Sequence, residues 1–255
     1  MLGPQAIQRI FYPGPLPSSY QGSDCSLLPA KVTCIISYKT PTLNVASYVR
    51  TTPSSRDVIF IFHHEPENDW FAGRGSNGQN FVTEFETQSV LIRRAADGAP
   101  NIKIAMAAEA FEYQPGTRWH QGVDCGYIPP ASYVSYYLAD IYESDPDGRA
   151  LPYSPVAVQW DTWLRCVTEA MKADPSAQVW LGVAEYGLGT LTGDKARART
   201  IAADAVYLPR QVPRFALWEY WWEDNSINWG CTVENCDWQF TDPATIREWR
   251  SLESR

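Results

Sequence analysis

Two glutamates at the ends of apolar runs are the residues of this chain best suited to chemistry. Glu65 closes the run Val58-Ile-Phe-Ile-Phe-His-His-Glu, and Glu185 closes the run Val179-Trp-Leu-Gly-Val-Ala-Glu. Each carboxylate stands where an apolar segment gives way to a polar stretch that contains glycine. This pattern is typical of buried parallel strands that deliver a side chain to the rim of an α/β barrel. Two carboxyl groups brought together on such a rim can catalyse the hydrolysis of glycosidic bonds.

The elements that must position these glutamates alternate along the chain. Strand-like apolar segments occur seven times, at Arg9–Tyr12, Val32–Ser37, Val58–His63, Ile102–Ala107, Tyr136–Tyr142, Val179–Ala184 and Phe215–Tyr220. Helices are predicted between or after several of these strands, from the spacing of apolar residues or from composition. They lie at Asn80–Ala96, Thr162–Lys172, Lys195–Tyr207 and Ala244–Leu252. Alternation of strands with helices predicts a parallel sheet with crossover helices.

The number of strands defines the expected fold class. A closed barrel of the TIM type has eight strands, and this sequence offers seven. The residues before Arg9 are too few for a full strand and helix. We therefore predict an α/β fold, a TIM-type (β/α)8 barrel with a reduced or missing first strand. No domain boundary or repeat stands out, so residues 1–255 are expected to form a single glycosidase-like barrel domain.

Composition excludes several classes of function. The formal net charge of −8 and the pI of about 4.9 argue against binding to nucleic acid, which needs clustered Lys and Arg. No apolar stretch reaches the roughly 18 residues that a membrane-spanning helix requires, so no contact with a membrane is expected. The first residues, Met1–Arg9, lack the basic region and apolar core of a secretory signal. No cofactor is expected.

The cysteines do not predict a zinc site, because the six of them include no CxxC pair. Cys231 and Cys236 are spaced for a disulfide across a turn. Cys34 and Cys166 lie in apolar surroundings and are expected to be unpaired and buried. Cys25 and Cys125 lie in loops and can pair only if the fold brings them together. An even count weakly favours an oxidising or extracellular setting.

The glutamate-bearing segments carry a resemblance to a known family. His64-Glu-Pro-Glu-Asn-Asp-Trp-Phe resembles the His-Glu segment at the fourth strand of glycoside hydrolase family 26, which is followed by a short polar link and a Trp-Phe pair. Glu185-Tyr-Gly resembles the Glu-x-Gly at the seventh strand of that family. If one N-terminal strand is absent, the third and sixth predicted strands become the fourth and seventh. Weaker similarity to bacterial members extends over Arg9–Pro17, Tyr127–Tyr142 and Trp238–Leu252.

The resemblance implies a retaining glycoside hydrolase that acts on a polysaccharide such as a β-mannan, a β-glucan or a cell-wall glycan. Glu65 would be the acid/base and Glu185 the nucleophile. The acid must hold a proton near neutral pH, so its pKa has to be raised by burial or by a neighbouring negative charge. The nucleophile must stay ionised to attack the anomeric carbon.

Further residues are expected to bind the substrate or support the two glutamates. Tyr142 is expected to donate a hydrogen bond beside Glu185, and His64 to support the acid or the sugar. The 11 tryptophans of the chain offer flat surfaces for sugar rings. The residues assigned to substrate binding are His64, Trp70, Asp140, Tyr142, Trp218 and Trp222, with Trp221 as an alternative stacking platform.

Other interpretations stay open at the same residues. Glu67 is either a solvated loop charge or a source of repulsion that raises the pKa of Glu65. Strand alternation places His63, rather than His64, on the side of Glu65, unless the strand has already ended there. A metal site built on His63 and Glu65 would have only two ligands, so no metal is expected. The family usually carries an arginine where this chain has Ile61.

A non-enzymatic role is the alternative function. In that interpretation the barrel is a carbohydrate-binding or structural module of a larger extracellular or virion assembly, such as a phage tail. The expected partners are then a polysaccharide and a larger protein assembly that supplies contacts to the N-terminus. Either function predicts an extracellular or virion-associated location.

Overall fold

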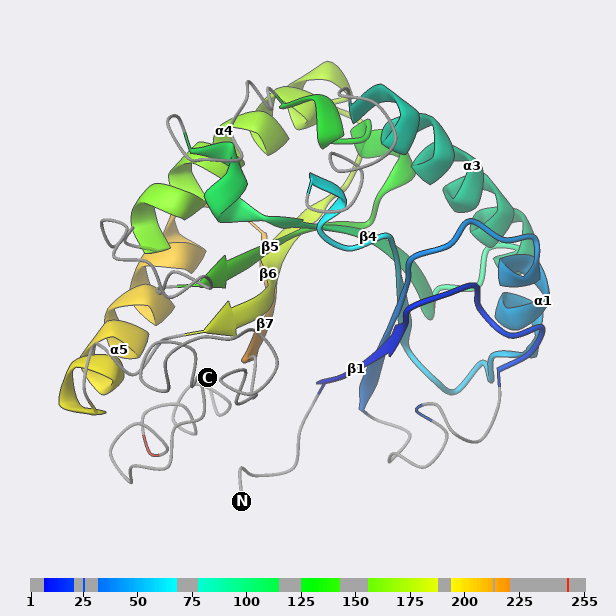
Figure 1. Cartoon of the computed structure of the whole chain (residues 1–255), viewed down its shortest axis with the longest axis horizontal. Helices are drawn as coiled ribbons and strands as arrows, with labels where there is room; N and C mark the ends of the chain where they lie inside the picture. The colour runs from blue at the N-terminus through cyan, green and yellow to red at the C-terminus, as the bar shows by residue number, and fades with distance from the viewer. Residues whose placement is uncertain are drawn as a thin grey trace.

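The computed structural model describes residues 7–20, 25, 32–67, 78–114, 125–142, 156–187, 194–212, 214–220 and 247. These residues form a curled parallel sheet with helices along its outer face (Figure 1). The strands follow each other in chain order, and every neighbouring pair is parallel: β1 (Ile7–Tyr12), β2 (Thr33–Tyr38), β3 (Val58–Phe62), β4 (Ile102–Glu109), β5 (Tyr136–Tyr142), β6 (Trp180–Gly187) and β7 (Phe215–Tyr220). The arrangement is that of a partial α/β barrel.

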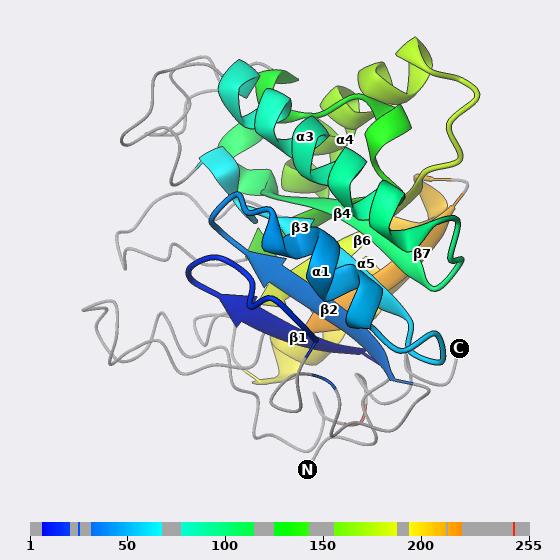
Figure 2. The same cartoon turned by 90° about the vertical axis from the view of Figure 1, so that its right-hand side faces the viewer.

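The helices form an arc around the convex side of the sheet (Figures 1 and 2). They are α1 (Asn44–Thr51), α3 (Gly78–Ala96), α4 (Val156–Ala173) and α5 (Asp194–Arg210), with short 3-10 turns η2 (Ala110–Tyr113), η3 (Cys125–Tyr127) and η4 (Ala131–Tyr133). In the described part of the chain, no helix combines the length and apolar character needed to cross a membrane.

Side chains of each strand alternate between two separate cores. The larger core lies between the sheet and the helices and includes Phe60, Phe81 and the tryptophan pair Trp160 and Trp163. The smaller core fills the inside of the curled sheet with Ile35, Ile59, Ile61, Ala105, Ala107, Leu138 and Ala184. Because successive side chains of a strand point to opposite faces, an apolar residue at nearly every position is needed to supply both cores.

Within the described residues, all seven predicted strands are present in the predicted order and pair in parallel, with boundaries that shift by a few residues. The helix at Thr162–Lys172 is also confirmed, although α4 begins six residues earlier, at Val156. It ends before Asp174-Pro175, because proline disfavours helical geometry in the residue before it. The expected helix at Ala244–Leu252 lies outside the described residues except at Arg247. Both the closed eightfold barrel and the single domain stay predictions.

Helix α1 was not predicted. Its buried residues, Val45, Tyr48 and Val49, have helical spacing, but the helix is only eight residues long. Helices this short draw their stability from packing rather than from their own sequence. Here the packing partner is α3, which follows β3 in the chain.

Two disulfides join elements of the described structure. Cys25 pairs with Cys34 of β2, and Cys125 of η3 pairs with Cys166 of α4, with Cα–Cα distances of 5.9 and 5.0 Å. The expectation that Cys34 and Cys166 are unpaired is therefore wrong. Each lies on a strand or helix and pairs with a cysteine of a loop. The apolar residues around Cys34 and Cys166 indicate burial, but they do not indicate which other cysteine lies beside them in the fold. The predicted pair of Cys231 and Cys236 lies outside the described residues.

Removal of the longer-range disulfide should weaken the fold. The bond between Cys125 and Cys166 closes a loop with a sequence separation of 41, so the double variant Cys125→Ala/Cys166→Ala should lose about 4 kcal/mol of unfolding free energy through gain of chain entropy. Urea unfolding followed by tryptophan fluorescence measures the loss. A midpoint equal to that of the oxidised wild type would contradict the pairing.

Candidate active site

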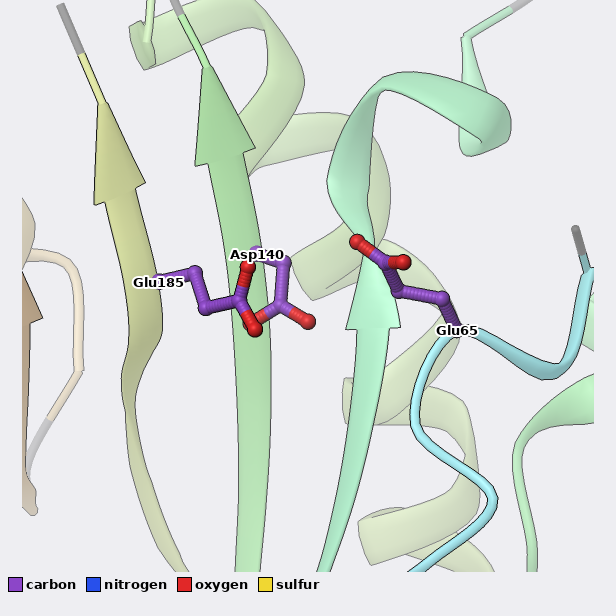
Figure 3. A group of neighbouring side chains, drawn as sticks. All are labelled: Glu65, Asp140 and Glu185. Atoms are coloured by element: carbon purple, nitrogen blue, oxygen red, sulfur yellow. The ribbon is translucent and has the colours of Figure 1, made fainter. Parts of the chain in front are cut away.

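Three carboxyl groups converge at the C-terminal end of the curled sheet. Glu185 projects from β6 and Asp140 from β5, and Glu65 faces them from the segment that follows β3 (Figure 3). One oxygen atom from each of the three lies within 4.8 Å of the others. Glu185 and Asp140 are buried and Glu65 is partly exposed. The C-terminal ends of barrel strands are where α/β barrels carry their functional groups.

An irregularity in β6 aims Glu185 into the barrel. Val183 pairs with Ala139 of β5, but the next pair joins Glu185, and not Ala184, to Asp140. The extra residue is Ala184, which packs in the inner core, whereas Val183 and Tyr186 both pack in the outer one. A bulge of this kind changes the face that the following side chain points to. Regular alternation after Ala184 would have turned Glu185 toward the helices.

Glu65 is presented by a turn rather than by a strand. Strand β3 ends at Phe62, and both His63 and Glu65 adopt left-handed backbone conformations with φ of 50°. The N–H of Glu65 donates to the carbonyl of Ala107 on β4 at 3.0 Å, which fixes the turn against the neighbouring strand. Left-handed geometry is uncommon for residues other than glycine and occurs often at functional sites.

The same turn separates the two histidines. The Nδ1 atom of His63 lies 2.8 Å from the carbonyl oxygen of Lys39, and its ring packs edge-on against Phe81 of the outer core. His64 points away from that core, with its ring 5.0 Å from that of Phe11 on β1. Strand alternation does not apply to this pair, because the strand has ended before it.

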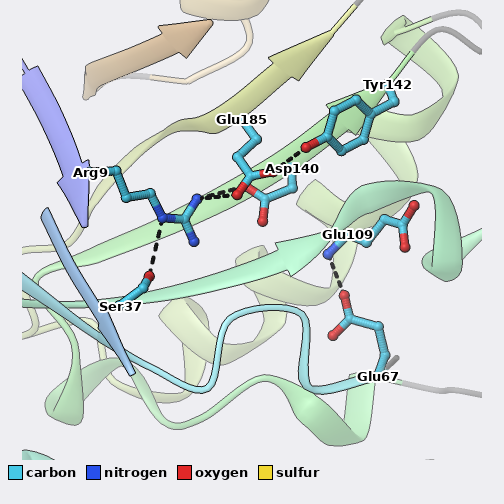
Figure 4. A network of polar contacts seen from close by, with 7 residues as sticks. All are labelled: Arg9, Ser37, Glu67, Glu109, Asp140, Tyr142 and Glu185. Atoms are coloured by element: carbon cyan, nitrogen blue, oxygen red, sulfur yellow. Dashed lines mark hydrogen bonds and ion pairs between the residues drawn. The ribbon is translucent and has the colours of Figure 1, made fainter. Parts of the chain in front are cut away.

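Arg9 connects three strands from inside the barrel (Figure 4). Its Nη1 atom donates to Oε1 of Glu185 at 2.6 Å and lies 3.9 Å from Oδ1 of Asp140, while Nε donates to Oγ of Ser37 at 3.1 Å. The guanidinium also lies 4.5 Å from the centre of the Phe11 ring. Sequence reasoning missed this role, although an arginine within the apolar segment Ile7–Tyr12 was a signal for it.

Tyr142 completes the surroundings of Glu185. Its O–H donates to Oε2 of Glu185, as Figure 4 shows. Burial, followed by the charges of Glu185, Glu65 and Asp140, raises the pKa of Tyr142. The phenol therefore keeps its proton and acts as a donor. Glu185 is held by one guanidinium and one phenol, both of which favour its ionised form.

The surroundings of Glu65 and Asp140 favour the protonated form instead. Burial raises the pKa of Glu65 well above its usual range, and the charges of Glu185 and Glu109 add to the effect. Burial and the charge of Glu185 likewise raise the pKa of Asp140, against the opposing effect of Arg9. Carboxyl groups this close oppose one another's ionisation, so the contacts favour the ionised form at Glu185 and the protonated form at Glu65 and Asp140.

His64 is a neutral imidazole beside this cluster. Burial, and then the charges of Arg9 and Lys39, lower its pKa to about 2. Its Nδ1 atom is buried and has no hydrogen-bond partner within the described part of the chain. A neutral histidine can both donate and accept a hydrogen bond, as sugar hydroxyls require.

The predicted stacking platforms are not placed. Trp70, Trp221 and Trp222 lie outside the described residues, and Trp218 belongs to β7 but its side chain is not described. Their proposed contacts with sugar rings stay predictions.

The three carboxyl groups also have the spacing of cation ligands. Local spacing in the sequence indicates only His63 and Glu65 as ligands, because the third carboxylate comes from β5 and is distant in the chain. Arg9 already supplies positive charge to Glu185 and Asp140. Metal ligands must be deprotonated, whereas burial favours the protonated forms of Glu65 and Asp140. The arrangement therefore suits proton transfer better than metal binding.

No protein-family model matches the sequence, and no curated protein matches it. Solved structures do match. A GH26 β-mannanase from Bacteroides ovatus has a TM-score of 0.53 at 11% identity, over 88% of this chain and 68% of that one. A GH86 protein in complex with neoagarooctaose gives 0.54 at 9% identity, over 87% and 46%. A triple variant of an endo-β-1,4-glucanase from Xanthomonas axonopodis pv. citri gives 0.53 at 13%, over 88% and 74%. At such identities the similarity establishes a glycoside-hydrolase-like fold.

Replacement of Asp140 by Asn should make stability less dependent on pH. The raised pKa of Asp140 in the folded state exceeds its ordinary value of about 4 in the unfolded chain, so the folded state binds more protons between these values. The stability from this proton is full below about pH 4 and is lost as the pH rises toward the folded pKa. The variant should therefore decline less steeply, by up to about 1.4 kcal/mol per pH unit.

Urea unfolding from pH 4 to pH 8 measures this slope. Equal slopes for Asp140→Asn and the wild type would show that Asp140 ionises normally.

Proposed function

We propose that this protein is a retaining glycoside hydrolase in which Glu185 is the nucleophile and Glu65 the acid/base. The observation that carries the proposal is the approach of their carboxyl oxygens to within 4.8 Å of each other. Retaining glycosidases hold the two carboxyl groups about 5–5.5 Å apart, whereas inverting enzymes need about 6.5–9.5 Å to admit a water molecule. The spacing favours direct attack by Glu185 on the anomeric carbon.

The electrostatics of the pair support these two roles. Glu185 is kept ionised by Arg9 and Tyr142, and Glu65 is kept protonated by burial and by the charge of Glu185. When Glu185 bonds to the sugar it loses its charge, so one cause of the raised pKa of Glu65 disappears. Glu65, which has just given its proton to the leaving oxygen, is then stable as a carboxylate. It can next remove a proton from the water that releases the sugar.

The substrate class follows from the net charge of the protein. A net charge of −8 disfavours a substrate that carries carboxylates or sulfates. A neutral β-linked polysaccharide fits best, and the names of two structural neighbours, a β-mannanase and an endo-β-1,4-glucanase, support that class. Membership of family 26 and stacking on Trp70, Trp218 or Trp222 belong to the same proposal.

The setting that we propose is outside the cytoplasm. The two described disulfides persist most readily in an oxidising environment. An extracellular enzyme or a component of a virion would meet this condition, and either would place the barrel where polysaccharides occur.

Replacement of either glutamate should separate the two roles. Glu185→Gln should abolish turnover and leave the fold intact, because the amide cannot form the glycosyl ester. Glu65→Gln should lower kcat about 10²–10⁴-fold on substrates with poor leaving groups and much less on aryl glycosides that need no protonation. Release of reducing sugar from mannan, β-glucan and agarose is the measurement, with proton NMR to show whether the first product retains its anomeric configuration.

Glu169→Gln is the control, because Glu169 is exposed on α4 and paired with Lys172 at 2.8 Å. It should keep wild-type activity. Binding of a polysaccharide without release of product by the wild type would instead favour the non-catalytic module. An inverted first product would overturn the assignment of Glu185 as nucleophile.

A further inference from the structure

Glu67 is buried beside the proposed acid/base. Its place in a polar segment of the sequence had left open that it is a solvated loop charge. It lies two residues after Glu65 and is only 5% exposed. Its Oε1 atom accepts a hydrogen bond from the backbone N–H of Glu109, the last residue of β4 (Figure 4). The interpretation as a solvated charge is therefore wrong.

The hydrogen bond of Glu67 continues the pairing between β3 and β4 beyond the end of β3. Regular pairing runs from Val58 with Ile102 to Ile61 with Ala105. Past that point the N–H of Glu65 donates to the carbonyl of Ala107, and the side chain of Glu67 accepts from the N–H of Glu109. The two bonds are two residues apart on both segments, which is the repeat of a strand face. The carboxyl group thus takes the place of a backbone carbonyl.

This contact gives the segment around Glu65 a second hydrogen bond to β4, so the backbone of Glu65 is held on both sides. Glu65 has a φ of 50°, a conformation that costs free energy and persists only where the surroundings enforce it. On one side its own N–H is bound to Ala107. On the other, Glu67 ties the chain to the end of β4. The direction of the Glu65 side chain toward Asp140 and Glu185 depends on both.

The environment of Glu67 favours a neutral carboxylic acid. Burial raises its pKa well above the usual range, and the charge of Glu65 adds to this, against the two backbone amides that it contacts. Its Oε2 atom and the hydroxyl groups of Tyr113 and Tyr127 are buried without hydrogen-bond partners among the described residues. The charges of Glu185 and Glu109 add to the effect of burial on the pKa of Glu65. Glu67 acts as a hydrogen-bond acceptor toward the backbone N–H of Glu109.

We propose that Glu67 is a positioning residue that clips the segment carrying Glu65 to the end of β4 and so aims the acid/base at the glycosidic oxygen. The clip itself is a property of the fold, whereas its effect on turnover rests on the proposed function. Misplacement of a catalytic group by about 1 Å can lower a rate about 10²-fold, so loss of the clip should lower kcat rather than substrate binding.

Two variants distinguish an acceptor from a charge. Glu67→Gln keeps an oxygen that can accept from Glu109 and removes the carboxyl, and Glu67→Ala removes both. Asn101→Ala is the control for general destabilisation, because Asn101 donates to the carbonyl of Arg56 at 2.8 Å and fastens β4 to the start of β3 at the opposite end of the barrel. The readouts are amide exchange of Glu109, carboxyl NMR titration of Glu65, and kcat and KM.

We expect Glu67→Ala to speed exchange of the Glu109 amide about tenfold or more. The pKa of Glu65 should fall as water enters. The variant should reduce kcat about 10²-fold and change KM less than about threefold. Glu67→Gln should restore slow exchange and most of kcat, and Asn101→Ala should lose stability with kcat unchanged. Equal effects of the Gln and Ala variants on the Glu65 titration would overturn the proposal in favour of a charge effect. So would an unchanged exchange rate in Glu67→Ala.

Exchange and titration do not need turnover. If the wild type releases no sugar, the proposed function fails, and these two readouts still decide whether the clip exists.

Discussion

Burial of three carboxyl groups within 4.8 Å of one another costs free energy, because each charge loses hydration and repels the others. The guanidinium of Arg9 offsets part of this cost. It contacts Glu185 directly, approaches Asp140, and is itself anchored by Ser37. A single cation does not neutralise three carboxylates, so burial favours the protonated forms of Glu65 and Asp140. The preference for an ionised Glu185 and a protonated Glu65 is the electrostatic basis of the proposed chemistry.

The position of Arg9 links this division to the fold. Arg9 lies on β1 and Glu185 on β6, so their ion pair crosses the inside of the curled sheet rather than joining neighbouring strands. Small and branched side chains fill the layer beneath, among them Ala105 and Ala107 on β4. The curvature of the sheet is therefore what brings a cation and a carboxylate 176 positions apart in sequence into contact.

Local departures from regular structure aim the individual side chains. The bulge at Ala184 turns Glu185 inward, and the left-handed turn after Phe62 presents Glu65. The buried contact between Glu67 and Glu109 extends the ladder that supports this turn. Regular strands alone would supply the rim but not the convergence of the carboxyl groups.

The sequence by itself determined the order of the elements and the segments that carry the glutamates. Strands buried on both faces need nearly continuous apolar runs, such as Val58–Phe62, so composition alone locates them. It also marked Tyr142 and Asp140, which do lie beside Glu185. These features are readable because each depends on residues close together in the chain.

Tertiary structure decided the partners. The role of Arg9, the disulfides of Cys34 and Cys166, and the burial of Glu67 all depend on residues that are distant in sequence or on where a strand ends. The face of the sheet to which Glu185 points depends on one extra residue in β6. This residue reverses the alternation of side chains that a sequence pattern assumes. The ionisation states follow from these placements, because a pKa is set by burial and by neighbouring charges in space, and neither is encoded by local spacing.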